Sequence, residues 1–188
     1  MFTRTLRTAA VTAIALPLAV GLAPAAHAAD LECRGTLGAV TVAGNLLVPD
    51  DSTCTLDGTT VLGSIVVKSR ATLVATGIET NGSIQGESPA RVDVRDSQLG
   101  NSIQLRKGGP VFISATTITG DVALEENLGQ VELTGNDIVG SVQANKNTGG
   151  LVITGNVVGN GLQCQDNFPP PAGGGNVAKQ KQGQCLNL

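Results

Sequence analysis

Carboxylates are the side chains in this chain best suited to acid–base chemistry, since its single histidine, His27, lies in the export leader predicted below. Asp93 and Glu132 would share one outward column of a stacked repeat, two coils apart, which is about 9.6 Å at a strand spacing of about 4.8 Å. That separation is near the upper limit for the two carboxylates of an inverting glycosidase. However, 15 Asp and Glu on a polar surface produce such pairs by chance. We therefore predict no catalytic residue and expect Arg95 to pair with Asp93 rather than to act as a lyase-type base.

A column of glutamines is the second candidate. Alternation places Gln85, Gln104, Gln143 and Gln163 outward in successive repeats, with Val66 and Ala123 in the remaining places. A flat ladder of amides repeated every ~4.8 Å could hydrogen-bond a polysaccharide chain. The commoner meaning is structural, because stacked amides also stabilise one another along a parallel sheet. The four glutamines are thus the candidate ligand-binding face, and the structural interpretation stands beside it.

The cysteines form the third group. Cys33 and Cys54 are 21 residues apart, and so are Cys164 and Cys185. This interval is one repeat plus one or two residues, so stacked coils bring each pair within the Cα separation that a disulfide accepts. An even number of cysteines in an exported protein also indicates disulfides. We predict one disulfide at each end, and no metal site or cofactor, because CxxC spacing and a histidine outside the leader are both lacking.

The elements that position these residues follow from a repeat of 19 or 20 residues. A first column of apolar residues recurs along the chain, and in most repeats its member follows a glycine and then Ser, Asn or Asp. A second column of apolar residues accompanies it, and each of its members lies 11 residues before the next member of the first column. The first column is Leu46, Ile65, Ile84, Ile103, Val122, Val142 and Leu162, and the second is Cys54, Leu73, Val92, Val111, Val131 and Leu151. The interval from first to second grows from 8 to 9 in the last two complete repeats, which places an extra residue in that turn.

Each repeat reads as short strands of alternating polarity, such as 103–105, 111–113 and 131–133. One repeat is too small for a sheet of its own, so its strands must pair in parallel with those of its neighbours. The chain is predicted to be all-β, a single right-handed parallel β-helix of about six to seven coils, disulfide-capped at both ends. A left-handed form would keep a strict rhythm of about 18 residues per coil. Phe112 is expected to point outward.

The N-terminus has the pattern of a secretory signal over residues 1–28. Arg4 and Arg7 supply the positive start, residues 9–20 the apolar middle and residues 26–28 the cleavage site. Removing Arg4 and Arg7 from the 12 Lys and Arg leaves 10 against 15 Asp and Glu, a net charge of −5. This charge argues against nucleic acid as a partner, and no later apolar run is long enough to span a membrane. We expect a secreted, extracellular product.

The β-helix is expected to occupy residues 29–188 as one domain. A Pro/Gly loop at 168–175 interrupts the array before residues 182–185 echo residues 161–164. We interpret the echo as a C-terminal capping coil and the loop as its lead-in.

The segments Cys54–Val61, Leu162–Cys164, Gly174–Val177 and Lys181–Cys185, with the repeated Gly-[Ser/Asn/Asp]-[Ile/Val] motif, carry a family resemblance. The mature chain resembles small exported, disulfide-capped parallel β-helix repeat proteins of Gram-positive soil bacteria. That resemblance implies the fold, export and disulfides, and it implies no reaction or ligand. The coil is also similar, more distantly, to pectate-lyase-like β-helices, a likeness that transfers no catalytic residue.

Taken together, these features predict a non-enzymatic structural or surface-binding module of the cell envelope or extracellular matrix. The alternative is a carbohydrate-active protein that binds extracellular polysaccharide through the glutamine column or cleaves it with Asp93 and Glu132. Expected partners are an extracellular polysaccharide or cell-wall polymer, or further copies of this chain.

Overall fold

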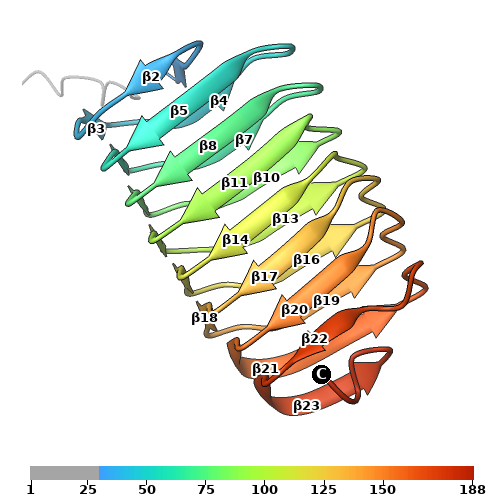
Figure 1. The fold of residues 1–188 in the computed structure, drawn as a ribbon. Coiled ribbons are helices and arrows are strands. Elements are labelled where there is room, and N and C mark those ends of the chain that lie inside the picture. Colours follow the sequence, from blue (N-terminus) through green and yellow to red (C-terminus); the bar gives the residue numbers. More distant parts are fainter. Residues whose placement is uncertain (1–29) are drawn as a thin grey trace, which may run out of the picture.

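The computed structural model describes residues 30–188, and every regular element in that range is a β-strand (Figure 1). The predicted signal, residues 1–28, lies outside the described residues. Within residues 30–188 there is no helix of the length and apolar character needed to cross a membrane.

The strands stack in parallel into three faces, which we call A, B and C. Face A contains β1 (Leu31–Glu32), β4 (Leu46–Val48), β7 (Ile65–Val67), β10 (Ile84–Glu87), β13 (Ile103–Arg106), β16 (Val122–Glu125) and β19 (Val142–Asn145). Face B contains β2 (Thr36–Leu37), β5 (Thr53–Asp57), β8 (Thr72–Thr76), β11 (Arg91–Arg95), β14 (Val111–Ser114), β17 (Val131–Thr134), β20 (Leu151–Thr154) and β22 (Ala172–Gly174). Face C contains β3 (Thr41–Val42), β6 (Thr60–Val61), β9 (Glu79–Thr80), β12 (Gln98–Leu99), β15 (Thr117–Ile118) and β18 (Asp137–Ile138). Two long strands, β21 (Val157–Gln165) and β23 (Val177–Gly183), run round the corner from face C to face A.

The result is a right-handed parallel β-solenoid, as predicted. In Figure 1 the strands of face B run one way in front and those of face A run the opposite way behind while the chain descends. Face B has 8 strands, one for each coil, so there are about eight coils rather than six to seven. The predicted number of coils was too low for two reasons. The first coil (β1 to β3) lacks the apolar pattern, and Ala172–Gly174, inside the predicted Pro/Gly loop, forms a strand that pairs with β20.

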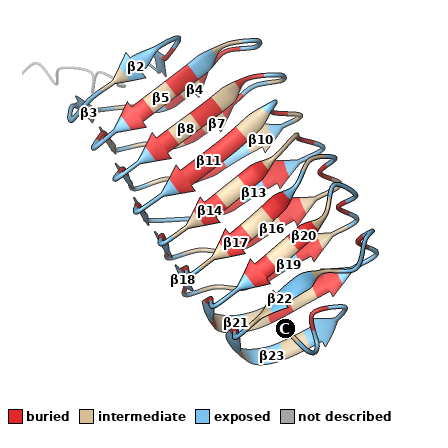
Figure 2. Cartoon of the chain, in the orientation of Figure 1, coloured by how far each residue is buried: buried red, intermediate tan, exposed pale blue. Residues whose placement is uncertain are grey.

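The core is a thin stack of aliphatic ladders between the faces. Every member of the first predicted column is fully buried, from Leu46 to Leu162, and the second column is buried likewise. Figure 2 shows this as buried positions alternating with partly or fully exposed ones along the strands. Face C adds a third ladder that the sequence analysis did not identify, with Val61, Leu99 and Ile138 among its members. The extra residue of the later coils does lie in the turn between faces A and B, since β16 ends at Glu125 and β17 begins at Val131.

Buried asparagines close two corners in the C-terminal half. They are Asn127, Asn147 and Asn167 between faces A and B, and Asn136, Asn156 and Asn176 between faces B and C. Each carboxamide oxygen accepts the backbone N–H of the equivalent residue one coil earlier, as Asn156 does from Asn136 at 3.0 Å and Asn136 from Thr116 at 3.1 Å. The amide nitrogen of Asn156 also donates to the carbonyl of Leu133 at 3.0 Å. These two asparagine ladders satisfy backbone groups that a buried corner would otherwise leave unpaired.

The third corner, between faces C and A, explains the recurring Gly-[Ser/Asn/Asp] motif. The second residue of the motif accepts a backbone N–H from the next coil through its side-chain oxygen, as Asn45 does from Ser64 at 2.9 Å and Asp121 from Ser141 at 2.7 Å. The preceding glycine lies where successive coils touch. A Cβ on Gly140 would stand 2.5 Å from the carbonyl oxygen of Gly120, closer than real contacts allow.

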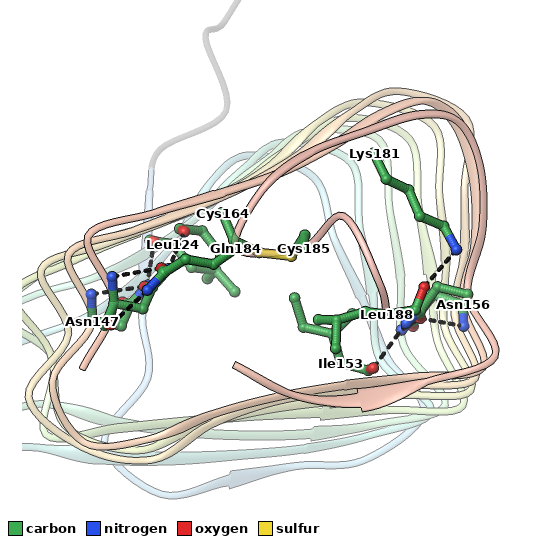
Figure 3. Close-up of a disulfide and its surroundings, with 12 residues drawn as sticks. Leu124, Asn147, Ile153, Asn156, Cys164, Lys181, Gln184, Cys185 and Leu188 are labelled. Carbon is green, nitrogen blue, oxygen red and sulfur yellow. Dashed lines mark hydrogen bonds between the residues drawn. A yellow bond between two sulfur atoms is a disulfide. The ribbon is translucent and has the colours of Figure 1, made fainter. Parts of the chain in front are cut away.

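Both predicted disulfides are confirmed. Cys33 pairs with Cys54 at a Cα separation of 5.5 Å, and Cys164 pairs with Cys185 at 5.2 Å. At the C-terminal end the chain turns back across the core, as Figure 3 shows around the second disulfide. Gln184 takes the place of the next asparagine there, because its Oε1 accepts the backbone N–H of Asn167 at 2.8 Å. The last coil is thus both covalently attached and hydrogen-bonded to the ladder beneath it.

Candidate ligand-binding face

The predicted glutamine column exists on face A. The strand register sets Gln85 beside Gln104, and Gln143 beside Gln163, with Ala123 between the two pairs. Gln85, Gln104 and Gln143 are exposed and Gln163 is partly exposed. The parallel strands hold these side chains outward at intervals of one coil, about 4.8 Å.

The column is longer than the sequence analysis proposed. Strand β23 places Gln182 beside Gln163, which extends the row by one coil. Gln182 follows Gln163 by 19 residues, the same interval that separates Gln85 from Gln104, so the repeat length alone could have placed Gln182 in the column. It was missed because the echo of residues 161–164 in residues 182–185 set Gln184 opposite Gln163, whereas the strand register sets Gln182 there.

The amides of the column do not form a ladder with one another. In the described part of the chain, the side chains of Gln85, Gln104, Gln143 and Gln163 make no hydrogen bond to another protein group. Gln182 donates to a neighbour on its own strand, Gln180, at 3.2 Å. Amides have both donor and acceptor capacity, so these side chains are available to a ligand or to water. The structural interpretation of the column therefore gains no support from the contacts.

Two open hollows lie along face A, one on each side of Ala123. The first, which we call the N-terminal groove, has a volume of about 550 Å³ and includes Gln85 and Gln104 in its lining. The second, the C-terminal groove, has a volume of about 300 Å³ and includes Gln143, Gln163 and Gln182. The glutamine column thus forms the floor of both grooves.

The border of the N-terminal groove is charged. Lys68, Glu87 and Arg106 stand in its lining at the ends of the face A strands, and Asp50 follows the end of β4 at the same corner. Glu87 pairs with Lys107 at 3.1 Å, and Arg106 pairs with Glu125 at 3.2 Å. These exposed ion pairs are screened by water and each contributes little to stability. A ligand in this groove would have to displace water from charged groups.

Face B carries the other concentration of polar groups. Asp93 is buried, and its carboxylate accepts from Arg95 at 2.6 Å and from Arg91 at 2.9 Å. The hydrogen bonds from Arg95, and then those from Arg91, hold the pKa of the Asp93 carboxyl below its usual value against the opposing effect of burial. The Arg91 guanidinium also lies over the ring of Phe112, 4.7 Å from its centroid.

This arrangement does not suit the weighed role of Asp93 and Glu132 in glycoside cleavage. Phe112 lies between them in the register, and both oxygens of Asp93 are occupied by guanidinium groups. A general acid needs a raised pKa, whereas that of Asp93 is lowered. Arg95 forms the ion pair that the sequence indicated, and Phe112 is partly exposed as expected. Among residues 30–188, no group of three or more His, Cys, Asp and Glu side chains is placed to hold a metal ion.

Comparisons with known proteins add no assignment: the chain matches no known protein family, no curated protein and no solved structure. Function must therefore be argued from the faces themselves.

Proposed function

We propose that this protein is a secreted, non-enzymatic β-solenoid module that binds an extended extracellular polysaccharide along face A. The observation that carries the proposal is the row of glutamine amides from Gln85 to Gln182, which lies along two grooves and is not consumed by hydrogen bonds within the column. The two disulfides suit an oxidising, extracellular setting.

The geometry fits a polymer better than a small molecule. The grooves are open and take their linings from three or more successive coils, whereas small-molecule sites are concave and enclose most of their ligand. Sugar hydroxyls both donate and accept hydrogen bonds, as amides do. The parallel strands fix the spacing of the amides, so a polymer that contacts one amide is held near the next, which favours a weak but repeated contact.

The second candidate is a purely structural role in the cell envelope or matrix. The disulfide-closed ends and the asparagine ladders favour it, since both serve stability rather than recognition. Cleavage by Asp93 and Glu132 remains a weaker alternative, for the reasons of geometry and pKa given above.

A pull-down with insoluble polysaccharides tests the proposal. The triple change of Gln85, Gln104 and Gln143 to Ala should abolish retention while leaving the melting temperature within about 3 °C, because all three side chains point to solvent. Gln98→Ala is the matched control, since Gln98 is an exposed glutamine on face C. If the wild-type protein is retained on no polysaccharide, binding is ruled out and the structural role is favoured. If soluble sugar products appear in the same tubes, the protein is an enzyme.

A further inference from the structure

The C-terminal groove differs from the N-terminal groove in its chemistry. Its polar lining consists of neutral groups, namely Ser141, Gln143, Asn160, Gln163, Gln180 and Gln182. The N-terminal groove has Asp50, Lys68, Glu87 and Arg106 in its lining. Taking neutral amides and hydroxyls out of water costs much less than taking charges out. The C-terminal groove is therefore the place on face A where an uncharged ligand is bound at least cost.

The local backbone adds residues from the corner to the lining of this groove. Strands β21 and β23 shift register between Val158 and Gly161, so β21 carries one extra residue through the corner. Both strands continue from face C to face A without the tight turn of the earlier coils. As a result Asn160 and Gln180, which stand near the corner, line the same hollow as the glutamine column.

Gly161 is the second observation that points to a ligand. It occupies the position at which earlier coils have Ser64, Ser102 or Ser141, the residue whose side chain continues the corner ladder. A Cβ on Gly161 would meet only the Ser141 hydroxyl, at 4.0 Å, whereas a Cβ on Gly140 would strike backbone at 2.5 Å. Its φ is not in the left-handed region either. Neither packing nor backbone conformation requires glycine at 161, and the missing side chain leaves the groove open.

We propose that the C-terminal groove is the principal subsite of face A and that it binds a neutral polysaccharide, an uncharged chain rich in hydroxyl or N-acetyl groups. The chain crosses β19, β21 and β23, where Gln143, Gln163 and Gln182 repeat at the coil spacing. Acidic polysaccharides are disfavoured because no lining residue of this groove carries a charge that could pair with a carboxylate, and Lys179 beside it donates a hydrogen bond to Asn160 at 3.2 Å. This inference rests on the proposed function and narrows it to one groove and one class of polymer.

The test uses the full-length secreted protein and two sets of probes. The neutral set is cellulose, chitin and mannan, and the acidic set is polygalacturonate and alginate. We expect retention on at least one neutral polymer, unchanged in about 0.5 M NaCl because no charged contact is screened. Gly161→Val should weaken that retention by about tenfold or more, because its side chain enters the groove and separates the ligand from the amides.

Four further variants separate binding from folding. Gly161→Ser restores the residue type of the earlier coils, so it should fold at least as stably as the wild type and still weaken binding. The pair Gln143→Ala and Gln163→Ala should weaken retention more than the pair Gln85→Ala and Gln104→Ala. Gln98→Ala on face C should leave retention unchanged.

The outcomes distinguish this inference from the proposed function. The assignment of the C-terminal groove is wrong if the wild type binds and the Gly161 variants bind equally well. It is also wrong if acidic polymers retain the protein as strongly as neutral ones do. In both cases the proposed function stands. If the wild type is retained on none of the five polymers, the proposed function fails. Loss of retention in Gly161→Ser with unchanged melting temperature supports both.

Discussion

The two halves of the solenoid close their corners by different means. In the C-terminal half, buried asparagines fill the positions that follow the left-handed turn residues, as Asn136 follows Gly135 and Asn156 follows Gly155. In the N-terminal half the corresponding positions hold small, apolar or hydroxyl side chains. They are Ser52, Ala71, Pro89 and Gly108 at one corner, and Thr59, Ile78, Ser97 and Thr116 at the other.

The difference shows two ways to bury a turn. An apolar or small side chain leaves the backbone to find its own partners, whereas an asparagine supplies a donor and an acceptor and stacks on its equivalent one coil away. A fully satisfied buried network also fixes the register of the coils, since each member has one correct neighbour. The C-terminal half should therefore be the more rigid one and the more sensitive to loss of a single side chain.

The largest effect is expected from Asn156→Ala. Asn156 is fully buried, and its removal leaves the Asn136 backbone N–H without an acceptor and takes away the hydrogen bonds to the Asn136 side-chain amide and the Leu133 carbonyl. Each unpaired buried group costs about 1–3 kcal/mol, so the free energy of unfolding should fall by about 3 kcal/mol or more. Urea denaturation followed by circular dichroism measures the change.

Ser97→Ala is the matched control at the same corner of the N-terminal half. The Ser97 hydroxyl accepts from the Ile78 backbone N–H at 3.2 Å and donates to the Arg95 carbonyl at 2.6 Å. Its loss should cost about 1–2 kcal/mol. Equal losses in the two variants would contradict the distinction between the halves.

The next effect concerns the two ends. Each disulfide closes a loop of the same length, with a sequence separation of 21, so the chain-entropy contribution is about 3 kcal/mol in both cases. Replacing Cys164 and Cys185 by Ser should nevertheless perturb more residues than replacing Cys33 and Cys54. Cys185 also holds Gln184 on the asparagine ladder, and releasing it exposes the end of that ladder.

Hydrogen exchange measures this difference directly. We expect the variant without Cys164 and Cys185 to lose protection in β23 and at Asn167, while the variant without Cys33 and Cys54 loses it only in the first two coils. Fraying of equal extent at both ends would show that Gln184 adds nothing to the disulfide.

Much of this architecture could be predicted from sequence, for identifiable reasons. The aliphatic columns through Ile103 and Val111 recur at a fixed period, and cysteines one repeat apart must meet in stacked coils. The asparagine ladders were missed because Asn is also a common turn residue, and its inward direction depends on the left-handed residue before it. The grooves were missed as well, since Gly161 has the same appearance in sequence as the glycines that packing requires. Gly161 differs from those glycines only in its distance to the backbone of the neighbouring coil, which the sequence does not reveal.

The smallest effect is one of pH, and it should be confined to the N-terminal half. The asparagine ladders do not titrate, whereas Asp93 is a buried carboxylate with a lowered pKa, held chiefly by hydrogen bonds from Arg95. A carboxyl whose pKa is lower in the folded state contributes stability above the unfolded pKa of about 3.9, and this contribution is lost as the pH falls through the folded value. Stability should thus decline below about pH 4, and Asp93→Asn should flatten that decline.

Hydrogen exchange at pH 6 and pH 3 locates the change. We expect it in β8, β11 and β14 but not in β17 or β20, where the corners are closed by Asn136 and Asn156. Equal acid sensitivity in both regions, or an unchanged pH profile in Asp93→Asn, would show that the Arg91–Asp93–Arg95 cluster does not stabilise face B.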